Sequence, residues 1–349
     1  MSALVKPLIV LALIATAVRW YVFGPGARRV DPRAEAEAAA ARRDFPAARA
    51  HLDHYLATAP TDRDTHLLAA RVARRTGDAP ASEAHLRRFA DLGGDRELVA
   101  LERALTRIEG GDPTGSGAVF EFCKARPDHP AVPFALESLT IGMRKIGQAD
   151  QAENCANEWL RRVVTPAEKA AAHVGRGLAL EMKGLTPEAA VEYRRAIALV
   201  PGHVEGRYKL AEFLTRDEPT EALGLFRGLV AEQPDRPEVR LGMARCHRQL
   251  GDHAAAAGVL GPLLRSRPDD PDVLAEAGVL ALDRGRPDEA QELLRRAVEK
   301  APTQRWSNVQ LLRCYQERGM AAEAETQKAR VKQIDDELEK RIAAMTRKP

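Results

Sequence analysis

The sequence is poor in aromatic residues and in cysteine. Aromatic residues make up 5% of the 349 positions, although the hydrophobic fraction is an ordinary 45%. The four cysteines, Cys123, Cys155, Cys246 and Cys314, lie far apart, with no Cys-x-x-Cys pair and no histidine at metal-ligand spacing around them. We interpret them as small buried hydrophobic residues. The cysteines therefore predict no metal site.

An excess of one charge is also missing. The chain has 53 Lys and Arg residues against 50 Asp and Glu residues, which gives a formal net charge of +3. This small excess is spread over a long chain, so it does not form the basic patch or stripe by which proteins attract duplex nucleic acid. We therefore expect no nucleic-acid partner.

The sequence motifs of common enzymes are absent as well. It contains no Gly-x-x-x-x-Gly-Lys-Ser/Thr, His-Glu-x-x-His or Gly-x-Ser-x-Gly motif, and the glycine-rich segment 110–117 follows no predicted strand. His51 and His54 share a helix face at a spacing that could hold a metal, but no third ligand accompanies them, and we favour a solvated pair. We expect no catalytic residues, no cofactor and no metal, and keep an enzyme as a remote alternative.

Long hydrophobic runs are confined to the N-terminus. The stretch from Leu4 to Phe23 is interrupted only by Lys6 near its start and Arg19 near its end. A helix of about 20 residues crosses the roughly 30 Å of a bilayer core, and the aromatic residues beside Arg19 suit a headgroup region. We therefore predict that residues 1–30 form a transmembrane signal anchor and a short hinge.

The same segment fits a second interpretation. The small residues at 15–17 follow a short apolar core, as at the cleavage site of a secretory signal, and cleavage would release a secreted or periplasmic module. We favour the uncleaved anchor, because the apolar character resumes beyond Arg19. Arginines follow the segment while only Lys6 precedes it, so the positive-inside rule favours a single-pass protein of the cytoplasmic (inner) membrane with its main part in the cytoplasm over one facing the periplasm.

The rest of the chain is rich in Ala, Leu, Arg and Glu, which favour helices. Pro201, Pro234, Pro268 and Pro302 recur at intervals of 33, 34 and 34 residues, and each interval reads as helix, glycine-containing turn, second helix and proline. Between Ala171 and Pro201, for example, the turn has Gly184. Small and bulky residues then follow at the spacing of one helix face: Ala189, Tyr193, Ala196 and Ile197.

These residues resemble the tetratricopeptide repeat family. Its pattern places small residues at positions 8, 20 and 27 of each repeat, a bulky residue at 24 and proline at 32. Two successive repeats match closely, with Ala244, Gly251, Ala256, Leu260 and Pro268, and then Gly278, Gly285, Ala290, Leu294, Ala297 and Pro302. The resemblance implies an all-α fold, a right-handed superhelical solenoid of stacked helix-turn-helix hairpins, here preceded by one transmembrane helix.

We expect the array of eight or nine hairpins to occupy residues 33–320, with a degenerate repeat near 95–130. Residues 321–349 continue the last helix. Their apolar positions, Val331, Ile334, Leu338, Ile342 and Met345, form one stripe, which indicates a capping helix over the last hairpin. A dimerising coiled coil is the alternative, but about two heptads make a short seam.

The resemblance implies that the first helix of each hairpin lines a concave surface that binds partner proteins or peptides. At three of the lining positions of each repeat we count nine cations against four anions, which suggests partners with acidic segments. Arginines that merely solvate exposed helices are the alternative. The candidate partner-binding residues are Arg71, Arg74, Arg75, Arg144, Lys145, Tyr208, Arg245, Arg248, Trp306 and Arg313.

The lysine and asparagine with which chaperone-binding members of the family clamp a terminal carboxylate are missing at the corresponding positions, where Tyr208 and Glu212 stand in one repeat. We therefore expect no binding of chaperone tails. The sequence predicts a membrane-anchored scaffold for protein–protein interaction.

Overall fold

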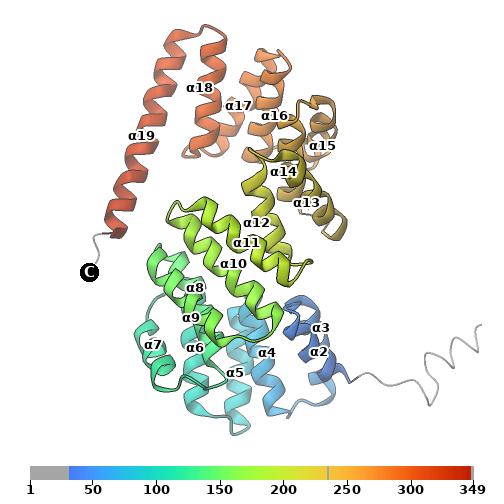
Figure 1. Ribbon diagram of the computed structural model, residues 1–349, viewed down its shortest axis with the longest axis vertical. Helices are drawn as coiled ribbons and strands as arrows, with labels where there is room; N and C mark the ends of the chain where they lie inside the picture. Colours follow the sequence, from blue (N-terminus) through green and yellow to red (C-terminus); the bar gives the residue numbers. More distant parts are fainter. Residues whose placement is uncertain (1–30, 234–235, 347–349) are drawn as a thin grey trace, which may run out of the picture. The chain divides into compact units, whose positions relative to one another are not determined.

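The computed structural model describes residues 31–233 and 236–346, and in these residues the regular secondary structure is entirely α-helical (Figure 1). The chain divides into two compact units, Met1–Thr106 and Arg107–Pro349. The described part of the first unit contains α2 (Pro32–Ala41), α3 (Phe45–Thr58), α4 (Arg63–Arg75), α5 (Ala79–Asp91) and most of α6 (Arg96–Gly110).

The second unit continues the pattern of helix pairs. Its helices are α7 (Ser116–Ala125), α8 (Val132–Lys145), α9 (Ala149–Arg162), α10 (Pro166–Met182), α11 (Thr186–Leu199), α12 (Val204–Leu214), α13 (Pro219–Glu232), α14 (Pro237–Gln249), α15 (His253–Ser266), α16 (Pro271–Asp283), α17 (Pro287–Lys300), α18 (Arg305–Glu317) and α19 (Ala321–Thr346). The expected all-α architecture of successive helical hairpins is thereby confirmed for the described residues.

Local sequence signals define the ends of these helices. At the start of α16, the side chain of Asp270 accepts hydrogen bonds from the backbone N–H groups of Asp272 and Val273, and Pro271 occupies the first turn. Asp270 thus satisfies two N–H groups that have no partner within the helix, and proline there sacrifices no hydrogen bond. After α16, Gly285 has φ of 68°, and the N–H of Arg286 donates to the Ala281 carbonyl at 2.8 Å. This left-handed turn reverses the chain into α17.

Small residues allow the helices to pack closely, as the repeat pattern predicts. A Cβ atom added to Gly278 would lie 2.7 Å from Leu294, and one added to Gly242 would lie 2.3 Å from the ring of Phe226. Real Cβ contacts are never so short, so these glycines let a bulky side chain of the neighbouring helix touch the backbone. Ala290 and Ala297 are fully buried on α17 in the same way.

The hairpins of the second unit are stacked in one layer order. The first helices of the hairpins, which we call the A helices (α8, α10, α12, α14, α16 and α18), each contact the next A helix in the series. The second helices, α9, α11, α13, α15 and α17, each pack against the A helix before and the A helix after. The A helices therefore form a continuous layer.

Three segments complete the description. In the region expected to be degenerate, α6 ends at Gly110 and α7 begins at Ser116, so residues 111–115 of the glycine-rich segment 110–117 connect the two helices. At the C-terminus, α19 packs on α18 and buries Ile334, while Leu338 is 49% exposed.

The predicted anchor, residues 1–30, lies outside the described residues. Across residues 31–233 and 236–346, none of the helices combines the length and the apolar character that crossing a bilayer requires.

Candidate functional site

Two of the candidate arginines of the first unit are held by a buried carboxylate. Arg71 Nε lies 2.6 Å from Glu102 Oε1, and Arg74 Nη2 lies 3.4 Å from Glu102 Oε2. The side chains of Arg74 and Glu102 are only 2% exposed. The neighbouring Arg75 places its guanidinium 5.4 Å from the centroid of the Phe45 ring. Arg71 and Arg74 thus join α4 to α6 by an internal ion-pair cluster.

The second unit repeats this arrangement between α14 and α16. Arg245 Nε lies 3.2 Å from Glu276 Oε2, and Arg248 Nε lies 2.6 Å from Glu276 Oε1. The Glu276 side chain is 1% exposed. Arg248 also reaches Asp283 Oδ2 at 3.2 Å. In both units one buried glutamate of an A-type helix receives two arginines, one turn apart, from the first helix of the preceding hairpin.

Sequence reasoning missed both glutamates, although a signal for them exists. Glu102 follows Arg71 by 31 residues and Arg74 by 28, and Glu276 follows Arg245 and Arg248 by the same two intervals. An Arg-x-x-Arg pair followed one repeat later by a glutamate at these intervals therefore marks an ion pair between successive hairpins. The count of cations against anions did not include these glutamates, because they lie at a position that was not assigned to the partner-binding surface.

Four of the candidate residues come together across α14, α16 and α18. The Arg245 guanidinium lies 5.5 Å from the centroid of the Trp306 ring, and Trp306 is partly buried against the core of the last hairpins. Arg313 Nη2 lies 3.4 Å from Asp283 Oδ1, and Arg313 Nε lies 2.7 Å from Glu317 Oε1. Arg245, Arg248, Arg313 and Trp306 thus share one surface of the A-helix layer. The three cations there are balanced by Glu276, Asp283 and Glu317.

Tyr208 on α12 lies in a similar environment. Its hydroxyl donates to Glu212 Oε1 at 2.8 Å, and its ring packs edge-on against Phe226 with the centroids 6.2 Å apart. The Arg236 guanidinium lies 4.3 Å from the centroid of the Tyr208 ring. Burial, together with the negative charge of Glu212, raises the pKa of Tyr208 above its ordinary value. Each candidate aromatic side chain is therefore partly buried beside an arginine.

The last two candidates lie at the end of α8. Lys145 is exposed and its Nζ donates to the backbone carbonyl of Glu109. Arg144 is partly buried, and within the described part of the chain its guanidinium makes neither a hydrogen bond nor an ion pair. Arg144 therefore differs from Arg245, Arg248 and Arg313, which all have carboxylate partners.

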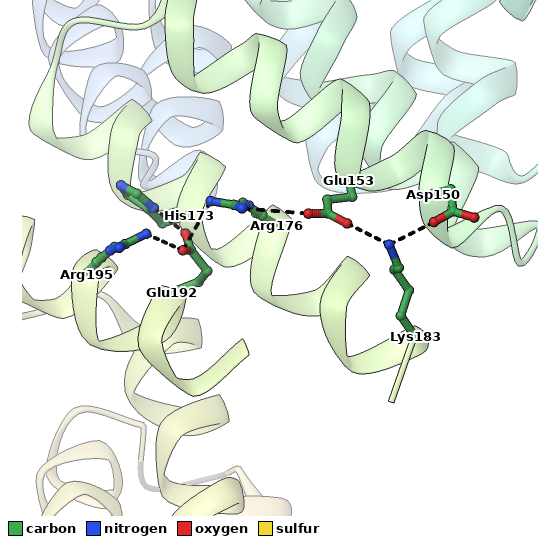
Figure 2. A network of polar contacts seen from close by, with 7 residues as sticks. All are labelled: Asp150, Glu153, His173, Arg176, Lys183, Glu192 and Arg195. Atoms are coloured by element: carbon green, nitrogen blue, oxygen red, sulfur yellow. Dashed lines mark hydrogen bonds and ion pairs between the residues drawn. The ribbon is translucent and has the colours of Figure 1, made fainter. Parts of the chain in front are cut away.

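A second polar network ties α9, α10 and α11 together (Figure 2). The buried Glu192 of α11 accepts from His173 Nδ1 at 2.7 Å, and it contacts Arg176 at 3.3 Å and Arg195 at 2.5 Å. Burial by itself would raise the pKa of Glu192, but the hydrogen bond from His173 and the positive charges of Arg176 and Arg195 outweigh burial and lower the pKa. Arg176 and Lys183 continue the network to Glu153 of α9.

The comparisons with known proteins agree with this architecture. One family model described as tetratricopeptide repeat matches residues 213–275 and 281–348, and a second with the same description matches 144–204 and 249–305. This chain is a tetratricopeptide-repeat protein. No curated protein sequence matches it significantly.

Solved structures resemble the repeat protein in fold. One chain of the crystal structure of the APC/C hetero-tetramer Cut9–Hcn1 matches 90% of this chain over 69% of its own length, with 13% identity and a TM-score of 0.52. PilW, a widely conserved type IV pilus biogenesis factor, matches 58% of this chain over 93% of its own length, with 17% identity and a TM-score of 0.50. Human IFIT1 matches 77% of this chain over 68% of its own length, with 18% identity and a TM-score of 0.50. At these identities the likeness establishes the helical-repeat fold alone.

The repeat array also has a cavity outside the A-helix surface. A cavity of about 290 Å³ lies between α7, α8 and α9, and its walls include Leu136 and the thiols Cys123 and Cys155. Burial raises the pKa of Cys123 to about 11 and that of Cys155 to about 12, so both thiols are protonated at neutral pH. All four cysteines are buried and free of disulfides. No three metal-ligating side chains gather in the described residues.

Proposed function

We propose that this tetratricopeptide-repeat protein is a membrane-anchored scaffold that binds partner proteins on the surface of its A-helix layer. The observation that supports this proposal is the continuous contact of α8, α10, α12, α14, α16 and α18, which presents side chains of six successive hairpins on one surface. A surface of this kind is large enough to hold an extended peptide or a helix, because each hairpin adds its own side chains along the layer.

Partly buried aromatic side chains supply the contact area for such a partner. Tyr208 and Trp306 are fixed by their neighbours, so little rotational freedom is lost when a partner covers them. Acidic partner segments belong to the proposal, but internal carboxylates already hold Arg245, Arg248 and Arg313. The preference for acid therefore has to come from cations without such a carboxylate.

A photocrosslinking experiment tests the position of the binding surface. The photoreactive amino acid benzoylphenylalanine replaces Phe134, an exposed residue of the A helix α8, or Val191, an exposed residue of α11. The two sites are both apolar and exposed, and they differ in the type of helix that carries them. We expect protein adducts at position 134 in intact cells and few at position 191. Equal adducts at both positions, or none at 134, would refute the proposed surface.

The anchor is tested at the N-terminus. We propose that residues 1–30 hold the scaffold in the inner membrane with the repeats in the cytoplasm, on the basis of the apolar run from Leu4 to Phe23 and the arginines that follow it. Mass spectrometry of the membrane fraction should detect the intact N-terminal peptide. A soluble protein that begins just after Ala17 would instead identify an exported module.

A further inference from the structure

Arg144 has an unusual environment for a cation in this protein. It lies in the last turn of the A helix α8, and its Nε atom is shielded from solvent without a hydrogen-bond acceptor. Across residues 31–233 and 236–346 no carboxylate forms an ion pair with it. A partly buried charge without a partner is unfavourable, because water no longer solvates it fully and no protein group replaces the water. Burial accordingly lowers the pKa of Arg144.

The charged groups that face Arg144 come from the next two A helices. These groups are Glu181 of α10 and Glu205 of α12. Both already have other cations nearby, since Lys209 Nζ lies 3.6 Å from Glu181 and Arg236 Nη2 lies 3.6 Å from Glu205. Lys209 also pairs with Glu212 at 3.0 Å. The local carboxylates therefore have closer partners than Arg144.

The tyrosine beneath Arg144 does not hold it either. Tyr193 of α11 is fully buried against Gly177, and its hydroxyl has no hydrogen-bond partner in the described residues. Tyr193 is a neutral phenol, because burial raises its pKa, and no hydrogen bond joins its hydroxyl to Arg144. Within the described residues, the hydrogen-bonding capacity of the guanidinium therefore stays unused. Natural proteins retain such an unfavourable group mainly at functional positions.

We propose that Arg144 is the anchoring residue for a side-chain carboxylate of an acidic segment in the partner protein. This proposal rests on the proposed function and gives it a position on the A-helix layer. The planar guanidinium of arginine can donate two parallel hydrogen bonds to a carboxylate. A carboxylate is favoured over a phosphate, because Glu181 and Glu205 would repel a doubly charged group more strongly.

The test measures binding of a fluorescein-labelled, C-terminally amidated hexaglutamate peptide to the full-length protein by fluorescence anisotropy, with hexaglutamine as the uncharged probe. A hydrogen bond to a charged group contributes about 1.5–3 kcal/mol, so we expect Arg144→Gln to weaken hexaglutamate binding about tenfold or more. Arg227→Gln is the matched control. Arg227 is an exposed residue of α13, a second helix outside the A-helix layer, and it has no ion pair in the described part of the chain. We expect its variant to bind within about twofold of the native protein.

Thermal unfolding separates binding from structure. Because Arg144→Gln removes a charge without a partner, we expect a melting temperature equal to or above that of the native protein. The anchoring role is overturned by a lowered melting temperature, by equal losses for Arg144→Gln and Arg227→Gln, by equal binding of hexaglutamine, or by the absence of hexaglutamate binding to the native protein. Persistent photocrosslinking at position 134 in those cases would leave the A-helix surface in place and remove only Arg144 from it.

Discussion

At the scale of single residues, the buried glutamates give the arginines around them a structural role. Arg245 and Arg248 sit at positions that the repeat pattern assigns to partner binding, but both contact Glu276 of the next A helix, α16. Their first role is to join successive hairpins. A reversal of both arginines to glutamate would place three carboxylates together, so it would test stability more than binding.

The Glu276 cluster makes a prediction about stability. Glu276→Gln leaves Arg245 and Arg248 without their shared counter-charge, and breaking a buried ion pair in this way costs about 3–5 kcal/mol. We expect urea unfolding of the second unit at a clearly lower denaturant concentration. Glu317→Gln is the control, because the Glu317 side chain is exposed and pairs only with Arg313 on the surface, which is worth about 0–1 kcal/mol. Equal effects of the two variants would show that Glu276 contributes no more than a surface charge.

At the scale of the helices, the turn glycines and the helix glycines have opposite roles. Gly285 ends α16 with φ of 68°, a conformation that other residues adopt only with strain, and the space around it is open. Gly258 lies inside α15, is exposed and has an ordinary helical conformation. Of these two glycines, the backbone conformation therefore indicates that the fold requires Gly285 and tolerates a side chain at Gly258.

Substitution by alanine tests this difference directly. We expect Gly285→Ala to destabilise the protein by about 1–2 kcal/mol, because the added Cβ opposes the left-handed turn. Gly258→Ala should stabilise it by about 0.5–1 kcal/mol, because alanine loses less conformational freedom than glycine when the helix forms. Thermal unfolding of both variants measures the two effects. A stabilising Gly285→Ala would contradict the assigned turn.

The first unit contains a histidine pair between α4 and α5. His66 Nδ1 lies 3.1 Å from His85 Nδ1, and His66 Nε2 lies 3.0 Å from the Pro60 carbonyl. A carbonyl oxygen only accepts, so His66 Nε2 donates to it, and when the His66 ring is neutral its Nδ1 accepts from His85. Protonation of both rings would turn this hydrogen bond into a repulsive contact.

The pair predicts acid sensitivity of the first unit. Burial, and then the charge on His66, lower the pKa of His85, although Asp53 and Asp78 oppose this shift and Arg49 reinforces it. In the unfolded state the pKa of His85 is about 6.5, which is higher than its pKa in the folded protein. As the pH falls below about 6.5, the unfolded state therefore binds a proton before the folded state does, and the free energy of unfolding decreases until the pH reaches the folded pKa. We expect His85→Gln to flatten this dependence between about pH 7 and pH 5. An unchanged slope of unfolding free energy against pH would exclude the histidine pair as its cause.

At the scale of the whole molecule, the repeat architecture confines the effect of most changes. In the described part of the second unit, the main helix contacts follow the order of the stack, so stability there is close to a sum of local terms. The C-terminal helix α19 is the exposed end of this series. It covers α18 with Ile334, which is buried, whereas Leu338 is half exposed.

The end helix therefore allows a test of this local behaviour. We expect Ile334→Asp to speed amide hydrogen exchange in α18 and α19, because it buries a charge at their contact, while exchange in α10 and α11 stays unchanged. Leu338→Asp, at a half-exposed position of the same helix, should alter neither region. Faster exchange throughout the second unit would mean that the array unfolds as one cooperative block.

The sequence by itself determined the helices, their hairpin order and the small residues at their crossings, because these depend on neighbouring positions. Gly285 fixes the turn after α16 and Pro271 fixes the start of α16, both through backbone geometry. Gly278 and Leu294 pack against each other, and they stand at the repeat positions that Ala244 and Leu260 occupy one repeat earlier. Only the tertiary structure decided which charges are partnered. Glu276 meets Arg245 and Arg248, while no carboxylate of the described residues pairs with Arg144, since ion pairing depends on where side chains from different hairpins meet in space.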